Sequence, residues 1–220
     1  MKTIFLSLLA AQINDRFNLG VWSDIPINAN EISYNEKGVK IGEYFTECEY
    51  PRYYFAKVLS LYGNVECIPE IAQTVRIGMG CTIGGNGFGY AEGPNRIRME
   101  INHLGNVKIG ENVILHNNVN IDRAVLGYTE IGEGTKIDSL VHIAHGAKIG
   151  KHCLIVAGSI IGGSVVIGNN SYIGMGAKIK NKVIIGTGVT IGAGAVVLQN
   201  VPKNETWIGV PAKKLEKKYK

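Results

Sequence analysis

Four positions in the second half of the chain have residue types that could support proton transfer and charge stabilisation: His145, Asp138, Gly163 and Lys182. A histidine can accept a proton at neutral pH, and Asp138 could hold its imidazole in one tautomer. Gly163 follows His145 by 18 residues, and without a side chain it leaves its backbone N–H accessible to a developing oxyanion. Lys182 could bind an anion. From these residues alone, a structural histidine, a turn glycine and a solvated lysine remain open alternatives.

Aromatic and basic side chains elsewhere could contact a planar or anionic ligand. Phe88 and Tyr90 lie in a glycine-rich segment and could stack on a sugar or a base, or simply pack within their loop. Near the C-terminus, Trp207 precedes Lys213 and Lys214, which suits a stacked base and a terminal phosphate. The same three residues could instead cover the end of a sheet, and the two roles are compatible.

A period of six residues predicts the fold that carries these candidates. From Ile131 to Val197 every sixth residue is a β-branched aliphatic, and the residue four positions further on is small or β-branched. The same register recurs at 109–121 and at 65–83. A period of six fits neither an α-helix nor a simple alternating strand, but it fits a short strand followed by a corner.

Three such hexads close one triangular coil of about 18 residues, and successive coils pair as parallel strands about 4.8 Å apart. The inward aliphatic side chains stack in files, so each coil buries its apolar side against its neighbours. The repeats suffice for roughly six coils. His145 comes two residues after an inward isoleucine, which places it at a corner with its side chain pointing away from the core.

The repeat divides the chain into three parts. Residues 1–64 predict a small α/β cap, with helices within 7–17 and 50–63 and strands within 20–25 and 30–35. The remaining two parts are a β-helix over 65–201, interrupted by an inserted loop at 84–106, and a capping tail over 202–220 that ends in a short lysine-rich helix. The fold class is therefore mainly β.

Composition bounds the function classes. An apolar fraction of 45% excludes a disordered chain, and no apolar run is long enough to span a bilayer. The net charge of +5 is concentrated at residues 171–220, where nine lysines face two glutamates, so this end is either an anion site or a solvated edge. Neither a nucleic-acid partner nor a resident metal is predicted.

The chain's cysteines and its first residues favour a reducing cytoplasm. No CxxC or short paired spacing joins the four cysteines, so neither a zinc site nor a disulfide framework is predicted: Cys48, Cys67, Cys81 and Cys153. The apolar stretch at 1–12 lacks a small-residue cleavage site, which argues against a secretory signal.

Three segments resemble one family closely: "YPRYYFAKVLSLY" (50–62), "NGFGYA" (86–91) and "NVNIDRAVLGYTEIGEGTKIDSLVHIAHGAKIG" (118–150). They are similar to the UDP-acylglucosamine N-acyltransferases of lipid A synthesis, which are hexapeptide-repeat acyltransferases. The resemblance implies a left-handed parallel β-helix, a homotrimer with sites between subunits, and transfer of an acyl group from a thioester carrier to the amino group of a nucleotide-linked sugar. The family's catalytic histidine falls on His145.

Two features depart from that family. The cap is shorter than its uridine-binding domain, and Lys182 stands where a second histidine is expected. In addition, "WIGVPAKKL" (207–215) is similar to the ends of coenzyme A-dependent sugar acetyltransferases. The combined resemblance predicts an N-acyltransferase that uses acyl-CoA and a nucleotide-linked amino or amino-dideoxy sugar, for surface polysaccharide or lipopolysaccharide. The alternative is an acyl carrier protein-dependent UDP-3-O-acylglucosamine N-acyltransferase.

The resemblance also distributes roles among the candidates. We expect His145 to be the catalytic base, Asp138 its orienting carboxylate and Gly163 the oxyanion donor. The residues expected to bind the sugar nucleotide are Phe88, Tyr90 and Lys182. Those expected to bind coenzyme A are Trp207, Lys213 and Lys214. A trimer is expected because a histidine at an outward corner needs a facing wall that one prism does not supply.

Two other classes compete. A γ-type carbonic anhydrase would place zinc between histidines of facing subunits, and four histidines make it worth weighing, although the usual His-x4-His spacing is absent: His116, His142, His145 and His152. A non-catalytic scaffold or ice-binding solenoid would show regular threonine or charge ladders on a flat face. The chain has none, and its interrupting loops would serve no purpose in such a protein.

Overall fold

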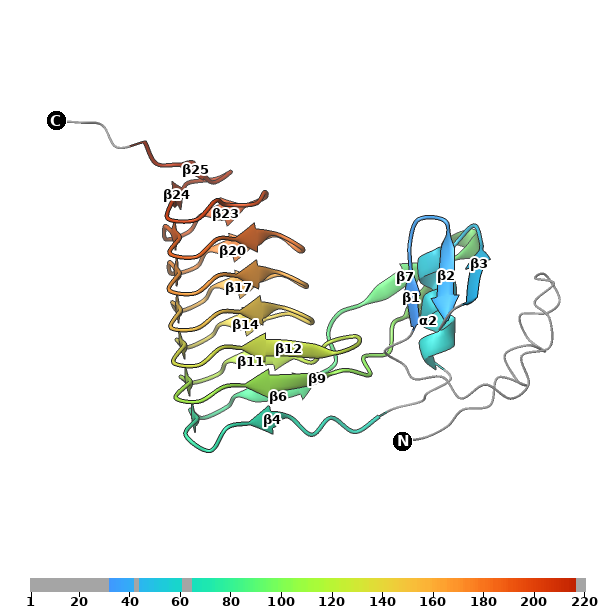
Figure 1. The fold of residues 1–220 in the computed structure, drawn as a ribbon, viewed down its shortest axis with the longest axis horizontal. Helices are drawn as coiled ribbons and strands as arrows, with labels where there is room; N and C mark the ends of the chain where they lie inside the picture. The colour runs from blue at the N-terminus through green and yellow to red at the C-terminus, as the bar shows by residue number, and fades with distance from the viewer. Residues whose placement is uncertain (1–31, 42–43, 61–64, 217–220) are drawn as a thin grey trace. The chain divides into compact units, whose positions relative to one another are not determined.

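The computed structural model describes residues 32–41, 44–60 and 65–216 (Figure 1). The chain divides into two compact units. The N-terminal unit contains the segment before Cys67 together with Phe88–Leu104, and the β-helix unit contains Cys67–Gly87 and everything after Leu104. The middle of the inserted loop therefore groups with the N-terminal segment.

The β-helix unit is a stack of triangular coils (Figure 1). It has three faces, in which strands of successive coils pair in parallel, and we call these faces A, B and C in chain order. Face A contains β4 (Glu70–Ile71), β9 (Asn106–Ile109), β12 (Tyr128–Ile131), β15 (Lys148–Ile149), β18 (Val166–Ile167) and β21 (Ile184–Ile185). Face B contains β5 (Arg76–Ile77), β10 (Ile114–Leu115), β13 (Lys136–Ile137), β16 (Leu154–Ile155), β19 (Tyr172–Ile173), β22 (Thr190–Ile191), β24 (Thr206–Ile208) and β25 (Lys213–Lys214). Face C contains β6 (Thr82–Gly85), β11 (Asn120–Asp122), β14 (His142–Ile143), β17 (Ile160–Ile161), β20 (Lys178–Ile179) and β23 (Val196–Val197). Edges AB, BC and CA are the corners between successive faces.

The hexad explains the core. The inward aliphatics from Ile109 to Val197 are at most 3% exposed, and they stack in register from coil to coil. The small positions between them include buried hydroxyls, and these donate to carbonyls of the next coil: Thr135 to Gly150, Ser159 to Gly174 and Ser171 to Gly186. These three buried hydroxyls therefore have acceptors, as a dry interior requires.

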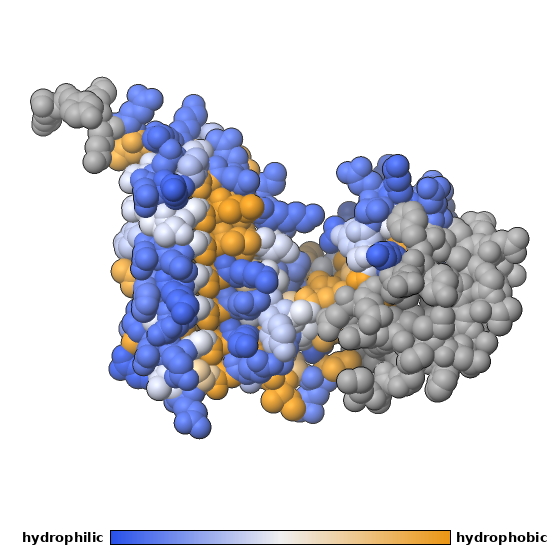
Figure 2. All heavy atoms as spheres, viewed as in Figure 1, coloured by the Kyte–Doolittle hydropathy of each residue, from blue (hydrophilic) through white to orange (hydrophobic). Residues whose placement is uncertain are grey.

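Corners are made by residues in the left-handed region. Glycine occupies that position at Gly146 (φ 67°), whereas Ser164 (φ 57°) and Lys182 (φ 65°) hold it in the next two coils on edge CA. Outward strand positions carry exposed apolar side chains on all three faces, among them Leu154, Ile160 and Ile184. Figure 2 shows this apolar surface running across successive coils on the visible side.

The N-terminal unit combines a three-stranded antiparallel sheet, a hairpin and a helix. Its elements are β1 (Ile32–Tyr34), β2 (Gly38–Ile41), β3 (Tyr44–Glu47), α2 (Pro51–Ser60), β7 (Tyr90–Glu92), the 3₁₀ turn η2 (Pro94–Arg96) and β8 (Arg98–Glu100). The helix contacts β1, β2, β7 and β8 and buries Phe55, Ala56, Val58 and Leu59. Gly93 lies against the Tyr53 ring, where an added Cβ would approach a ring carbon to 2.4 Å. This close approach joins the inserted hairpin β7–β8 to the helix.

The predicted helix within 50–63 and the predicted strand within 30–35 correspond to α2 and β1. The sequence pattern missed the β2–β3 pairing. The predicted helix at 7–17 and strand at 20–25 lie outside the described residues.

The tail differs from its prediction. Instead of a lysine-rich helix, the described part of the tail forms β24, which continues face B, and β25, which pairs with it antiparallel. The last coil has unpaired backbone groups along its open edge, and a strand satisfies them whereas a helix does not. Residues 217–220 lie outside the described residues.

Candidate functional site

The ring of His145 lies directly on Gly163, one coil further along edge CA. A Cβ added at Gly163 would be 2.8 Å from Nε2 and 2.9 Å from Cε1 of His145, so the ring occupies the space of the missing side chain. The Ser164 N–H also donates to the His145 carbonyl at 2.9 Å. The structure therefore brings together the two positions that the 18-residue spacing singled out.

The N–H of Gly163 is engaged by a side chain. It donates to Oδ1 of Asn181 at 3.2 Å, whereas the neighbouring Gly162 and Ser164 donate to backbone carbonyls. An oxyanion at this N–H would have to take the place of the Asn181 amide oxygen. Lys182 follows Asn181 on the same edge, is exposed, and donates its own N–H to the Gly163 carbonyl at 2.9 Å.

Asp138 is not the carboxylate beside His145. It follows β13 on edge BC, whereas His145 follows β14 on edge CA. Its Oδ1 accepts from the Ser139 N–H at 2.7 Å and its Oδ2 from the Ala157 N–H at 3.2 Å. The carboxylate thus caps two turns, and the predicted orienting role has no geometric support within one chain. Asp138 precedes His145 by seven residues, about one hexad, and this separation places the two residues on different edges of the prism.

A polar cluster that the sequence prediction missed lies on face C and reaches edge CA. Thr82, Asn120 and His142 are stacked in register on β6, β11 and β14. The Thr82 hydroxyl donates to Asn120 Oδ1, and Asn120 Nδ2 lies 2.8 Å from His142 Nδ1 and 3.1 Å from Asp122 Oδ1. His142 Nε2 is 3.7 Å from Asp122 Oδ2. Asp122 ends β11 and is 6% exposed.

The electrostatics of Asp122 connect this cluster to His145. Burial raises the pKa of the Asp122 carboxyl, and three interactions oppose that rise: the charge of His142, the hydrogen bond from Asn120, and the charge of His145. The pKa of Asp122 therefore depends on the charges of both histidines. The sequence contained a signal for this cluster, because Ile121 and Ile143 are inward positions of the same face in successive coils. Once the longer loop after β11 is allowed for, they pair with each other and bring Asn120 next to His142.

The remaining substrate candidates lie elsewhere. Phe88 is 90% exposed and its ring centroid is 4.9 Å from that of Tyr90, but both belong to the N-terminal unit. Whether they meet His145 stays a prediction.

Trp207 contradicts the expectation of an exposed stacking surface. It is 7% exposed, because its indole continues an inward file of face B and covers the end of the core. Its Nε1 donates to Glu205 Oε2 at 2.8 Å, and Glu205 Oε1 accepts from Lys214 Nζ at 2.5 Å. These two hydrogen bonds lower the pKa of Glu205. Lys213 is exposed, so of the three predicted coenzyme A contacts it alone is both exposed and outside this network.

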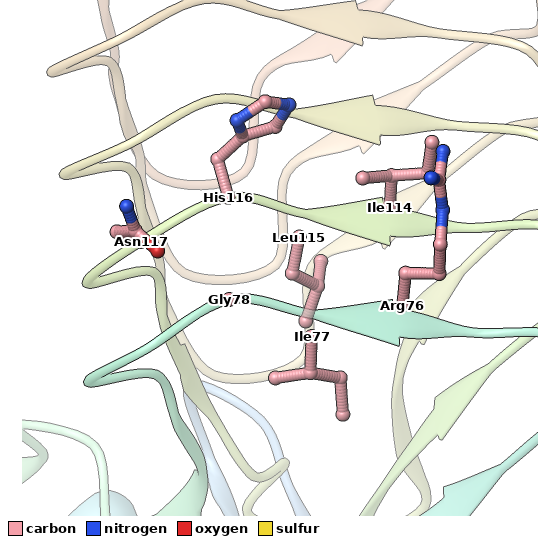
Figure 3. Close-up of a pocket in the computed structure, with 7 residues that line it drawn as sticks. All are labelled: Arg76, Ile77, Gly78, Ile114, Leu115, His116 and Asn117. Atoms are coloured by element: carbon pink, nitrogen blue, oxygen red, sulfur yellow. The ribbon is translucent and has the colours of Figure 1, made fainter.

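A shallow pocket of about 290 Å³ lies near the first coils, away from edge CA. Figure 3 shows Arg76 alongside Ile114, with His116 and Asn117 at the corner. His116 is on edge BC and His152 on edge AB, so the four histidines considered for zinc are spread around the prism. Within the described residues, no three metal-ligating side chains converge. None of the described helices is both long enough and apolar enough to cross a membrane.

Comparison with known proteins bears on the repeat and on the fold. Residues 128–163 and 164–199 match the family described as bacterial transferase hexapeptide, six repeats. The β-helix is a hexapeptide-repeat domain. Among solved structures, a UDP-N-acetylglucosamine acyltransferase from Arabidopsis superposes with a TM-score of 0.60 at 24% identity, covering 67% of this chain and 51% of that one. One from Bacteroides fragilis gives 0.55 at 23%, covering 69% and 60%. These likenesses confirm the predicted left-handed β-helical fold.

Two sequence relatives with the same name illustrate the similarity. A UDP-3-O-acylglucosamine N-acyltransferase from Caulobacter vibrioides is 46% identical over 147 residues, which cover 67% of this chain and 43% of the relative. One from Helicobacter pylori is 45% identical over 83 residues, or 38% and 24% of the two chains. The chain thus spans less than half the length of these curated relatives.

Proposed function

We propose that this protein transfers an acyl group from a thioester to the amino group of a nucleotide-linked amino sugar. The observation that carries the proposal is the half-buried His145 ring lying on the buried Gly163 at edge CA of the β-helix, in a chain whose relatives are named N-acyltransferases. The pairing supplies a proton acceptor next to a backbone N–H donor, the two elements that attack by an amine on a thioester needs.

The reaction follows from these two groups. The amine nitrogen attacks the thioester carbonyl carbon, and His145 takes a proton from that nitrogen as the C–N bond forms. The carbonyl oxygen becomes an oxyanion, which the Gly163 N–H stabilises after displacing the Asn181 amide oxygen. When the tetrahedral intermediate collapses, the C–S bond breaks and the imidazolium returns the proton to the departing thiolate. Lys182, on the same edge, would face the phosphates of the sugar nucleotide.

For the substrates, we favour UDP-3-O-acylglucosamine with acyl carrier protein as the donor. The names of the relatives specify that acceptor and N-acyl transfer, and the choice of donor rests on the burial of Trp207, which removes the indole face that an adenine would need. The second version, acyl-CoA with an amino-dideoxy sugar nucleotide, rests on the resemblance of 207–215 to coenzyme A enzymes. Exposed Lys213 suits either donor, since an acidic carrier protein and a nucleotide phosphate are both anionic.

The test is a mass-spectrometric assay that crosses acceptors with donors. The acceptors are UDP-3-O-acylglucosamine and a set of UDP- and dTDP-linked amino-dideoxy sugars; the donors are acyl carrier protein thioesters and short acyl-CoAs. The favoured version predicts an amide product from the first acceptor and the carrier-protein donor. Product from an amino-dideoxy sugar and acyl-CoA would support the second version, and no amide product from any pair would contradict the proposal. Truncation of the tail is a poor probe, because it would remove Trp207 from the core.

We further propose that the active form is a homotrimer. His145 stands at an edge of a single prism, and the prism faces carry exposed apolar side chains such as Ile160, Ile184 and Leu154 that a second copy would cover. Light scattering coupled to size-exclusion chromatography, run on active fractions, tests this. A monomer with full activity would contradict a site shared between subunits.

A further inference from the structure

The corner that contains Gly163 is held to the coils on either side by backbone hydrogen bonds. The N–H groups of Gly162 and Ser164 donate to backbone carbonyls, and the Gly163 carbonyl accepts from the Lys182 N–H at 2.9 Å. The Gly163 N–H is the exception, because it donates to a side chain, the amide of Asn181, at 3.2 Å from Oδ1. Exchange of this bond would leave the backbone bonds of the corner intact. Because Asn181 is exposed, its amide oxygen would then bind water.

The same cap recurs on the other two edges of the prism. On edge AB, Asn169 Oδ1 accepts from the Lys151 N–H at 2.8 Å, and on edge BC, Asn117 Oδ1 accepts from the Met79 N–H at 2.9 Å. In all three cases a glycine precedes the capped residue, and a Cβ added to that glycine would come within 2.7 Å of the asparagine oxygen. The asparagine cap is therefore a structural device of this β-helix, and its copies on edges AB and BC are internal references for the one on edge CA.

On edge CA the capped N–H has different surroundings. Lys151 and Met79 have side chains of their own, whereas Gly163 has none and the imidazole of His145 occupies that space, with Nε2 2.8 Å from the position of an added Cβ. The bond to Asn181 is also the longest of the three, at 3.2 Å against 2.8 and 2.9 Å. The longest of these caps thus covers the N–H that lies next to the proposed proton acceptor.

We propose that Asn181 is an internal competitor of the acyl donor: its amide oxygen occupies the Gly163 N–H in the free protein and is displaced by the thioester carbonyl. The inference rests on the proposed function for the identity of that ligand. The two oxygens exclude each other, because one N–H makes a single hydrogen bond of good geometry. Since Asn181 has left both in the bound complex and in the transition state, the cap raises KM for the donor and leaves kcat unchanged.

The first experiment measures donor binding without turnover. Acyl-CoA and acyl carrier protein thioesters are titrated, with no acceptor present, into the isotopically labelled full chain, and the Gly163 amide resonance is followed by NMR. In Asn181→Ala the midpoint of this titration should fall by about twofold to tenfold, because one competing hydrogen bond is removed. In Asn181→Asp it should rise by about tenfold or more, because a carboxylate is a stronger acceptor than an amide.

Matched variants on edge AB separate competition from a purely structural role. Asn169→Ala and Asn169→Asp change the equivalent cap of Lys151 and should leave the donor midpoint unchanged. If Asn181 only held its corner together, Asn181→Asp would preserve donor binding, since it keeps an acceptor, and Asn181→Ala would weaken it. That order of midpoints would overturn the inference. Equal midpoints in wild type and Asn181→Ala, or a Gly163 resonance that neither thioester moves, would do the same.

Steady-state kinetics distinguish failure of this inference from failure of the proposed function. If the wild-type chain makes amide product, Asn181→Ala should lower KM for the acyl donor by about twofold to tenfold, with kcat and KM for the sugar nucleotide little changed. A lower kcat with an unchanged donor KM would contradict competition while the proposed function stands. If the wild-type chain makes no product and the NMR midpoints still shift as expected, the proposed function fails and the competition for the Gly163 N–H is supported.

Discussion

Two carboxylates of the β-helix, Asp122 and Asp138, have opposite surroundings. Asp138 is on edge BC, and both of its oxygens accept backbone N–H groups of turns. Asp122 reaches edge CA, is buried, and faces His142 across 3.7 Å. The first carboxylate stabilises local backbone; the second faces ionisable side chains from the next coil.

The difference shows how a β-helix brings functional groups together. Residues one coil apart on the same edge are in contact, as the 18-residue pair His145 and Gly163 demonstrates. Residues about one hexad apart occupy different edges even though they are close in sequence. A candidate site in such a fold is therefore found by following one edge through successive coils.

Removing the imidazole of edge CA should give the largest effect. We expect His145→Ala to lower kcat by about 10²- to 10⁴-fold because the proton acceptor is lost, with little change in melting temperature. His116→Ala is the matched control, an exposed histidine on edge BC, and should keep wild-type kcat. Steady-state kinetics of both variants check this; equal losses would mean that edge CA is not the reaction site.

Displacing that imidazole without removing it should cost less. Gly163→Ala places a Cβ 2.8 Å from the position of His145 Nε2, so the ring must move, and we expect kcat to fall about tenfold to a hundredfold. The clash is with the end of a side chain, so the folded state should survive. Gly85→Ala, which adds a Cβ into open space, is the control. If the two alanine variants have the same kcat, contact between His145 and Gly163 has no part in catalysis.

On edge BC the expected effect is on stability. Asp138→Ala leaves the N–H groups of Ser139 and Ala157 without their carboxylate acceptor, and we expect the free energy of unfolding to drop by about 1–3 kcal/mol. Urea denaturation followed by circular dichroism measures it. An unchanged midpoint would show that water or relaxed turns replace both bonds, and would weaken the contrast with Asp122.

The smallest expected effect is a pH dependence from Asp122. Burial raises the pKa of this carboxyl above its ordinary value of 3.8, so the folded chain holds the proton more tightly than the unfolded chain. Stability contributed by the protonated form is therefore present below pH 3.8 and is lost as the pH rises through the raised value. Asp122→Asn lacks this step. We expect its urea midpoint, relative to wild type, to rise across that window and then level off; a difference independent of pH would contradict the prediction.

Much of the fold follows from local pattern. The six-residue spacing of β-branched aliphatics predicts inward files, and those side chains are buried from Ile109 to Val197. The same spacing places His145 at a corner and predicts that it meets Gly163, since 18 residues make one coil. Pro51 and the apolar positions that follow it predict α2 for the same local reason.

What the sequence by itself determined is thus everything that depends on one repeating coil: the β-helix, the outward corner of His145 and its contact with Gly163. Tertiary structure decided the remaining features, because these depend on pairing between distant segments of the chain. Asp122 meets His142 only because the longer loop after β11 preserves the register of Ile121 with Ile143. The tail forms a strand and buries Trp207 because the last coil presents an open edge and an uncovered core, which no local pattern in residues 202–216 records.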